Sequence, residues 1–211
     1  MNYTYHYSSP LGGITLTSDG KYLTGLCFDK KKYTTSNNKR QEKLLPIFKQ
    51  TVRWLNIYFS GKEPKFTPPL KMQTTPFRKQ VWEIMLKIPY GKTMTYGEIA
   101  SKIAKQNGLK KMSAQAVGGA VGHNAIAIII PCHRVIGTNG SLIGYSAGIS
   151  KKIKLLELEK SLYFNASTGS IFAAFRAGYI EKIKPVIIAI PKAKTTASRL
   201  KEVFILITLP I

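Results

Sequence analysis

The sequence predicts an α+β protein, in which a small strand-and-helix domain precedes a mostly helical domain containing a helix-turn-helix. Two observations carry this prediction: β-rich runs occupy residues 3–28, and amphipathic helical patterns dominate from residue 77 onward. A segment with three prolines separates the two regions. We therefore predict an N-terminal α/β domain over residues 1–61, a linker over 62–75, a second domain over 76–163 and an atypical tail over 164–211. A chain of 211 residues is long enough for two small domains with cores.

The N-terminal domain begins with strand patterns. YTYHY alternates, SSPLGG is a turn cluster, and ITLTSDGKYLTGLCF gives two β-rich runs around the hairpin signal Asp19-Gly20. A lysine-rich polar loop follows. A helix is then predicted from Pro46 to a stop at Gly61. Its expected inner face comprises Ile47, Val52, Leu55 and Phe59.

The second domain reads as three short helices. The first ends before Pro89, and its apolar positions recur at helical spacing: Phe77, Val81, Ile84, Met85 and Ile88. Thr95 and Glu98 form a capping-box pattern that opens the second helix, with Ile99, Ala100, Ile103 and Ala104 inward. Ser113 is expected to cap the third helix, which ends by Asn124. The last two helices match a helix-turn-helix, although many helix pairs share this pattern.

The stretch IIIPCHRVIG follows these helices. The apolar run 126–130 predicts a buried strand that Pro131 ends, and Cys132, His133 and Arg134 come next. A cysteine in such a place is commonly a small buried hydrophobe. Here the polar neighbours favour a reactive thiol, because His133 and Arg134 are expected to lower its pKa.

A glycine-rich loop leads to a last helix, for which Ser150 is the expected cap. Its apolar side is predicted to contain Ile153, Leu155, Leu156 and Leu162. Glu157 lies between two lysines and suits a solvated ion-pair face. Glu159 falls on the apolar side, where a carboxylate needs a partner unless it reaches solvent at the helix edge. We predict that Cys132, His133 and Glu159 form a nucleophile–base–carboxylate set, with His133 contacting the thiol directly or through a water.

The amino-acid composition limits the kinds of binding partner that we expect. Thirty-two Lys+Arg against 10 Asp+Glu give a net charge of +22, which suits DNA, RNA or an anionic membrane, while a solvated basic surface is the alternative. The 2 cysteines and 3 histidines exclude a disulfide framework and show no metal-ligand spacing. The sequence has neither a signal-peptide pattern nor an apolar run of the ~18 residues that span a bilayer. We expect a soluble cytoplasmic protein that does not bind membranes.

PCHRVIG, preceded by MTYGEIA and AVGGAVGHN and followed by GYSAG and LLELE, resembles the methylated-DNA–protein cysteine methyltransferases, or O6-alkylguanine-DNA alkyltransferases. YHYSSPLGGITL is similar to the N-terminal domain of that family, and the resemblance covers residues 1 to about 163. It implies a ribonuclease-H-like N-terminal domain and a helix-turn-helix domain that carries the PCHR motif. It also implies a monomeric, single-use DNA-repair protein. Cys132 would accept the alkyl group of O6-alkylguanine, and of O4-alkylthymine, and keep it. The partner would be double-stranded DNA bound through its minor groove, with the base flipped out and no cofactor or metal.

The resemblance also assigns residues. His133 would act as base through a water, with Glu159 orienting it. Tyr96 would help to protonate the departing guanine, and Asn124 would hold the chain near the cysteine. Arg134 would be a structural or phosphate-facing cation. The remaining pocket and DNA contacts would be Gln115, Ala116, Gly118, Gly119, Val135, Tyr145 and Ser146.

Two positions depart from the family pattern. Gln115 stands where many members have an arginine that fills the space of the flipped base, so flipping is expected to be weaker or to depend on other basic residues. Ala125 replaces a common proline, which predicts a less rigid loop. The turn of the helix-turn-helix is longer than in the family pattern. It adds lysines that could bind phosphate or simply be solvated: Lys102, Lys105, Lys110 and Lys111.

Two other functions remain open on the sequence. One is a DNA-binding alkylation sensor or regulator of the same fold, and the other is a cysteine hydrolase acting on an acyl substrate through Cys132 and His133. Relatives of the regulator type replace the cysteine, which favours the repair protein. The tail, 164–211, could be a small accessory element, a disordered extension or a translated scar; Cys27 is expected to pack in the small sheet.

Overall fold

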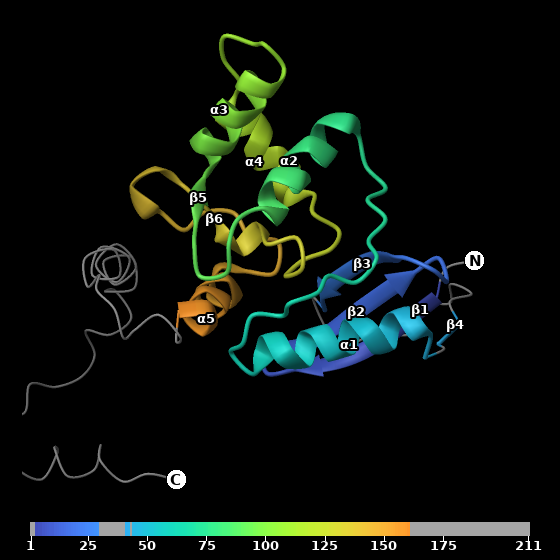
Figure 1. Ribbon diagram of the computed structural model, residues 1–211. Coiled ribbons are helices and arrows are strands. Elements are labelled where there is room, and N and C mark those ends of the chain that lie inside the picture. Colours follow the sequence, from blue (N-terminus) through green and yellow to red (C-terminus); the bar gives the residue numbers. More distant parts are fainter. Residues whose placement is uncertain (1–2, 30–40, 43, 161–211) are drawn as a thin grey trace, which may run out of the picture. The chain divides into compact units, whose positions relative to one another are not determined.

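The computed structural model describes residues 3–29, 41–42 and 44–160, which belong to one compact unit (Figure 1). The lysine-rich loop at 30–40 and the tail predicted at 164–211 lie outside these residues. Strands and one helix come first and a helical region follows, so the α+β class predicted from the sequence is confirmed. The ribonuclease-H-like assignment of the first region remains a prediction.

The N-terminal sheet contains β1 (Tyr3–Ser9), β2 (Gly12–Ser18), β3 (Leu23–Phe28) and β4 (Gln41–Glu42), in the order β3-β2-β1-β4. β1 and β3 both pair antiparallel with β2. The predicted turn at Asp19-Gly20 is confirmed, because Gly20 adopts φ 108° and the Asp19 carboxylate accepts from the backbone N–H of Lys21 and Tyr22. Cys27 is exposed, so the expectation that it packs in the sheet is wrong. Successive side chains of a strand point to opposite faces of the sheet, and its neighbours Leu26 and Phe28 lie on the buried face.

Helix α1 (Pro46–Phe59) packs against this sheet, and the rings of Tyr5 and Phe48 stack 5.9 Å apart. Its start at Pro46 is as predicted, but the inner face differs from the one expected. Val52 and Phe59 are only half-buried. The fully inward positions are Ile47, Phe48, Thr51, Trp54, Leu55 and Tyr58. Aromatic side chains thus occupy the buried face, which is rotated about the helix axis from the predicted one. On this face, Tyr58 points toward the second region.

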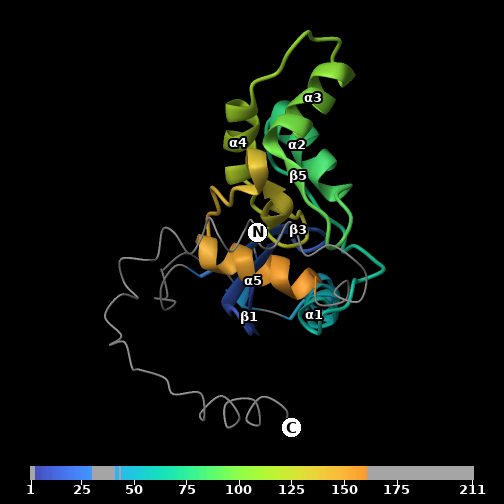
Figure 2. The same ribbon diagram turned by 90° about the vertical axis from the view of Figure 1, so that its left-hand side faces the viewer.

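The helical region contains α2 (Pro76–Leu86), α3 (Tyr96–Gln106) and α4 (Ala114–Gly122), which lie together in both views (Figures 1 and 2). The capping box of Thr95 and Glu98 and the Ser113 cap are confirmed. Trp82 Nε1 donates to the carbonyl of Ala120 at 2.9 Å and fixes α2 on α4. Most of the predicted apolar positions are buried, whereas Phe77 is half-buried.

The apolar run 126–130 is buried, but the prediction of a strand is wrong. A single bridge joins Ile126 to Leu26, and the chain then turns, with Ile128 at φ 68°. A continuous run of apolar residues indicates that a segment is buried but does not determine its backbone conformation, which explains the wrong prediction. Cys132–Arg134 form the 3₁₀ turn η1, followed by β6 (Val135–Ile136) and the 3₁₀ turn η2 (Thr138–Gly140).

The last helix, α5, spans Ile149–Lys160. Ser150 lies inside it, so the predicted cap at this residue is wrong; Gly148, at φ 94°, precedes the helix instead. Leu155 and Leu156 are buried as expected, and Ile153 is half-buried. Two charged residues, Lys152 and Glu159, share the buried side at 0% exposure.

Candidate active site

Two backbone pairings bring the segment around Cys132 into place. β6 pairs in parallel with β5 (Met94–Thr95), so that the entry to α3 lies beside the chain leaving η1. On the other side, Leu26 of β3 donates to the carbonyl of Ala125 and accepts from the N–H of Ala127, both at 2.8 Å. The edge of the N-terminal sheet thereby holds the segment that precedes Cys132.

Cys132 is buried, with 4% of its surface exposed, and Asn124 holds its sulfur. Asn124 Nδ2 lies 3.2 Å from Cys132 Sγ and donates to the carbonyl of Ile130 at 2.7 Å. Asn124 Oδ1 accepts from the N–H of Ile126, which fixes the orientation of the amide. Burial raises the pKa of the Cys132 thiol, and the opposing effects of Asn124 and Lys152 are smaller. The expected low thiol pKa is therefore wrong in direction: the resting form is the neutral thiol.

Glu159 organises a buried cluster that we call the carboxylate cluster: Tyr58, His133, Arg134 and Glu159. Its Oε1 lies 2.6 Å from His133 Nε2 and accepts from Tyr58 Oη at 2.8 Å. Arg134 donates to both oxygens, from Nε at 2.9 Å and Nη2 at 3.0 Å, and the Gly91 N–H donates to Oε2 at 3.1 Å. Although burial raises it, His133 and Arg134 together lower the pKa of Glu159 to about 2. The partner that Glu159 required is present, and the solvated helix-edge alternative is wrong.

His133 is held in one tautomer by this cluster. Its Nε2 faces an ionised carboxylate oxygen, so the proton resides on Nε2 and the lone pair on Nδ1. Nδ1 is buried and has no hydrogen-bond partner within the described part of the chain. Burial lowers the pKa of His133, against the opposite effect of Glu159, which keeps the ring neutral near pH 7. A neutral imidazole with its lone pair directed away from the carboxylate is able to accept a proton.

Arg134 lies inside the protein at 8% exposure. Besides Glu159, its Nη1 donates to the carbonyl of Ile88 at 2.7 Å, and its guanidinium lies 5.5 Å from the Tyr90 ring centre. These contacts support the structural rather than the phosphate-facing alternative.

Tyr96 begins α3 and lies near Cys132. A Cβ added at Gly118 of α4 would lie 3.9 Å from its ring, and one added at Gly144 would lie 3.5 Å from its hydroxyl. That hydroxyl donates to the carbonyl of Ile143 at 3.1 Å. Burial, followed by the nearby Cys132, raises the pKa of Tyr96, so it remains a hydrogen-bond donor. The hydroxyl of Tyr145 is also buried, without a partner among the described residues.

The other expected contacts divide between the interior and the surface. Val135 is fully buried, whereas Ser146 is exposed. On α4, Gln115, Ala116 and Gly119 are exposed, and no atom lies within 4 Å of a Cβ added at Gly119. This helix therefore presents a face of small side chains that another molecule's backbone could approach closely.

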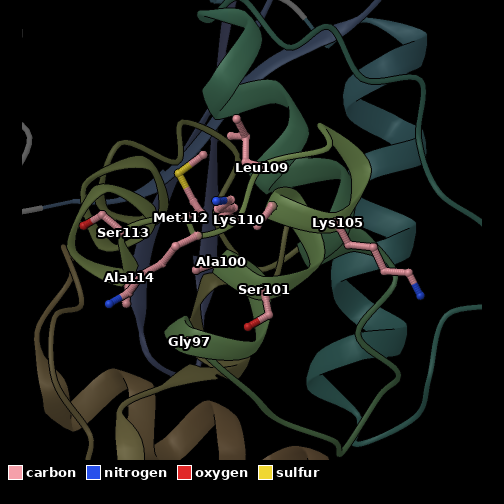
Figure 3. A pocket seen from close by; sticks show the side chains of 11 residues that line it. Gly97, Ala100, Ser101, Lys105, Leu109, Lys110, Met112, Ser113 and Ala114 are labelled. Carbon is pink, nitrogen blue, oxygen red and sulfur yellow. The ribbon is translucent and has the colours of Figure 1, made fainter.

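A pocket of about 940 Å³ lies between α3 and the turn before α4 (Figure 3). It is lined by Lys105, Lys110 and Lys111, together with Ser101, Ser113 and apolar side chains of the same segments. In Figure 3 the Lys105 side chain extends away from Met112 and Leu109. Cys132 and the carboxylate cluster are not part of its wall.

Two participants were not recognised from the sequence. Tyr58 belongs to the first region and lies 101 positions before Glu159 in the chain. No local sequence pattern indicates a contact between residues so far apart. Lys152 reads as one more surface lysine, yet it is fully buried and donates to the carbonyls of Val135 at 2.6 Å and Ile143 at 3.0 Å. Its place four residues before Leu156 on the apolar side of α5 was the available clue.

The described residues contain no group of three or more histidine, cysteine or acidic side chains placed to hold a metal ion. Over the same part of the chain, none of the helices is both long and apolar enough to cross a membrane.

Comparison with family models gives two matches. Residues 1–72 match the 6-O-methylguanine DNA methyltransferase, ribonuclease-like domain, and residues 76–161 match the DNA binding domain of the same family.

Individual proteins that are similar to this chain agree with these family matches. A methylated-DNA–protein-cysteine methyltransferase of Mycobacterium tuberculosis is 45% identical over 159 residues, covering 74% of this chain and 93% of the relative. One from Haemophilus influenzae is 37% identical over 182 residues, covering 86% and 98%. Among solved structures, that of Mycobacterium tuberculosis OGT in complex with DNA matches with a TM-score of 0.66 and 41% identity, covering 82% of this chain and 99% of that one.

Proposed function

Because the chain belongs to the 6-O-methylguanine DNA methyltransferase family, we propose that it repairs alkylated DNA by transferring the alkyl group to Cys132. DNA repair by alkyl transfer and DNA binding follow from the family and its relatives. The sensor and hydrolase alternatives are not favoured. The observation that carries the assignment to Cys132 is its neighbour His133, whose Nε2 lies 2.6 Å from Glu159 and leaves Nδ1 as a base.

The reaction begins with a neutral thiol, because burial raises the pKa of Cys132. We propose that a water carries the thiol proton to His133 Nδ1, and that Glu159 stabilises the imidazolium through Nε2. The thiolate attacks the alkyl carbon; the S–C bond forms while the bond from that carbon to O6 of guanine breaks. The sulfur keeps the alkyl group, so each protein molecule reacts once. The chain supplies the nucleophile and DNA supplies the alkyl group, so the transfer requires no cofactor.

The guanine leaves as an anion and takes up a proton. Tyr96 is suited to assist, since its raised pKa keeps the hydroxyl protonated; on base binding this hydroxyl would exchange the Ile143 carbonyl for the base. Tyr145 and Val135 would form pocket walls, and Ser146 would contact the base. Asn124 would keep Cys132 aimed at the alkyl carbon.

We propose that double-stranded DNA approaches the exposed face of α4 through its minor groove, and that the protein acts as a monomer. Gly119 and Ala116 permit close backbone approach, and Gln115 would hydrogen-bond to the base left unpaired. Lys105, Lys110 and Lys111 beside the start of α4 would neutralise phosphates.

Incubation of equimolar protein with an oligonucleotide containing O6-methylguanine, followed by intact-mass measurement, tests this function. We expect a gain of one methylene on the peptide that contains Cys132. Cys132→Ser should show no gain, whereas Cys27→Ser, a change at the exposed cysteine, should behave like the wild type. DNA binding without a mass gain would support the regulator instead, and multiple turnovers on an acyl ester would support the hydrolase.

A further inference from the structure

Lys152 is a buried lysine that the mechanism above does not use. It sits on the inner side of α5 at 0% exposure, and its ammonium group donates to the carbonyls of Val135 and Ile143. Burying an ammonium group in this way is costly unless its donors are satisfied. The two carbonyls satisfy two of its three N–H groups.

These two carbonyls mark the ends of one segment. Val135 follows the Cys132–Arg134 turn directly, and Ile143 precedes Gly144, where an added Cβ would lie 3.5 Å from the Tyr96 hydroxyl. The Ile143 carbonyl accepts from both Lys152 Nζ at 3.0 Å and Tyr96 Oη at 3.1 Å. Lys152 therefore ties the chain leaving the nucleophile to the loop that also contacts Tyr96.

We propose that Lys152 is a positioning residue for alkyl transfer: its ammonium group fixes the segment from Val135 to Ile143 beside Cys132, and its positive charge favours the thiolate. This inference rests on the proposed function for its link to alkyl transfer. The link to the thiol itself can be measured without DNA.

The electrostatic part has a defined sign. Burial lowers the pKa of Lys152 to about 8, and the nearby Cys132 acts in the opposite direction. In return Lys152 lowers the pKa of the thiol against the larger effect of burial. The other titratable or charged groups around this pair are Tyr96 on α3, Tyr145 in the loop, His133 on η1, and Glu159 with Arg134 in the carboxylate cluster.

Lys152→Met removes the charge and both hydrogen bonds at similar volume, and Lys152→Gln removes the charge but keeps a donor. The rate of iodoacetamide labelling of Cys132, followed by mass against pH, reports the thiolate fraction without any DNA. We expect both variants to label about tenfold more slowly at pH 7, where the wild-type lysine is charged, and this difference to shrink above pH 8, where the lysine loses its charge. Transfer from methylated DNA should slow at least as much, and more in Lys152→Met than in Lys152→Gln. Lys154→Met, an exposed lysine on the same helix, is the matched control and should leave both rates unchanged.

A folded variant that labels at the wild-type rate at pH 7 would overturn the charge effect, even if its urea midpoint had fallen, since a purely structural role lowers stability alone. If both variants fail to fold, the labelling profile of the wild type decides. Loss of the lysine charge near pH 8 should make the labelling rate rise less steeply above that pH than below it, and an unchanged slope through pH 8 would refute the coupling. Failure of the proposed function would look different: labelling would still depend on Lys152, but methylated DNA would not react with the wild type.

Discussion

Glu159→Gln is the sharpest test of the carboxylate cluster, because it replaces one oxygen by an NH₂ group and keeps the volume. In the wild type the two oxygens of Glu159 receive five hydrogen bonds, from His133, Tyr58, Gly91 and twice from Arg134. A glutamine presents one amide NH₂ group that cannot accept, so donors must face donors on one side. The charge that balances Arg134 disappears as well.

Two estimates of the cost agree. The pKa of Glu159 is about 2 in the folded protein rather than 4.5, which corresponds to about 3 kcal/mol of stability above pH 4.5. Removing one partner of a buried ion pair costs about 3–5 kcal/mol in other proteins. Because the folded pKa is the lower one, this stability is present above pH 4.5 and is lost as the pH falls from there toward 2. We expect Glu159→Gln to lose about 3 kcal/mol at pH 7 and progressively less, relative to the wild type, in that acidic window.

The assay is urea unfolding at several pH values, combined with the single-turnover rate of methyl transfer at pH 7. The rate should fall by about 10²–10⁴, the usual contribution of an oriented general base, because the imidazolium loses its counter-ion. Glu157→Gln, on the exposed side of the same helix, is the control and should change neither quantity. A variant as stable as the wild type at pH 7, or a stability difference that persists unchanged at pH 2–3, would refute the reasoning.

Three further predictions concern other elements. Tyr58→Phe removes the hydroxyl that donates to Glu159 at 2.8 Å, and it should lower the free energy of unfolding in urea by about 1.5–3 kcal/mol. The control Tyr7→Phe loses an exposed hydrogen bond to Asn56 and should lower it much less. Equal losses in the two variants would contradict the role of the cluster. Ser113→Ala should lower stability by about 1 kcal/mol by removing the cap of α4, while Ser150→Ala, inside α5, should stay within about 0.5 kcal/mol in thermal melts; the reverse order would speak against the observed helix starts. Gln115→Arg should speed repair of duplex DNA more than reaction with the free methylated base, because it acts on base flipping; equal acceleration of both, measured in single turnover, would exclude that role.

Local patterns in the sequence predicted much of the fold. Period-two alternation located the strands, and the capping residues Thr95 and Ser113 located the starts of α3 and α4, because these signals depend on residues a few positions apart. The same reasoning failed at 126–130, where an unbroken apolar run satisfies burial in any backbone conformation. It also misplaced the start of α5 at Ser150, since a serine near a helix start is a cap only if the backbone before it is not yet helical.

What the sequence determined by itself was the set of candidate reacting groups and the α+β frame. Cys132 and His133 are adjacent in the chain, and the amphipathic pattern already placed Glu159 on a buried face. What the tertiary structure decided was how these groups are tuned. Tyr58 and Lys152 enter the site from distant elements, and the thiol pKa is raised rather than lowered. Burial and long-range partners set the energy of a charge, and both exist only once the chain has folded.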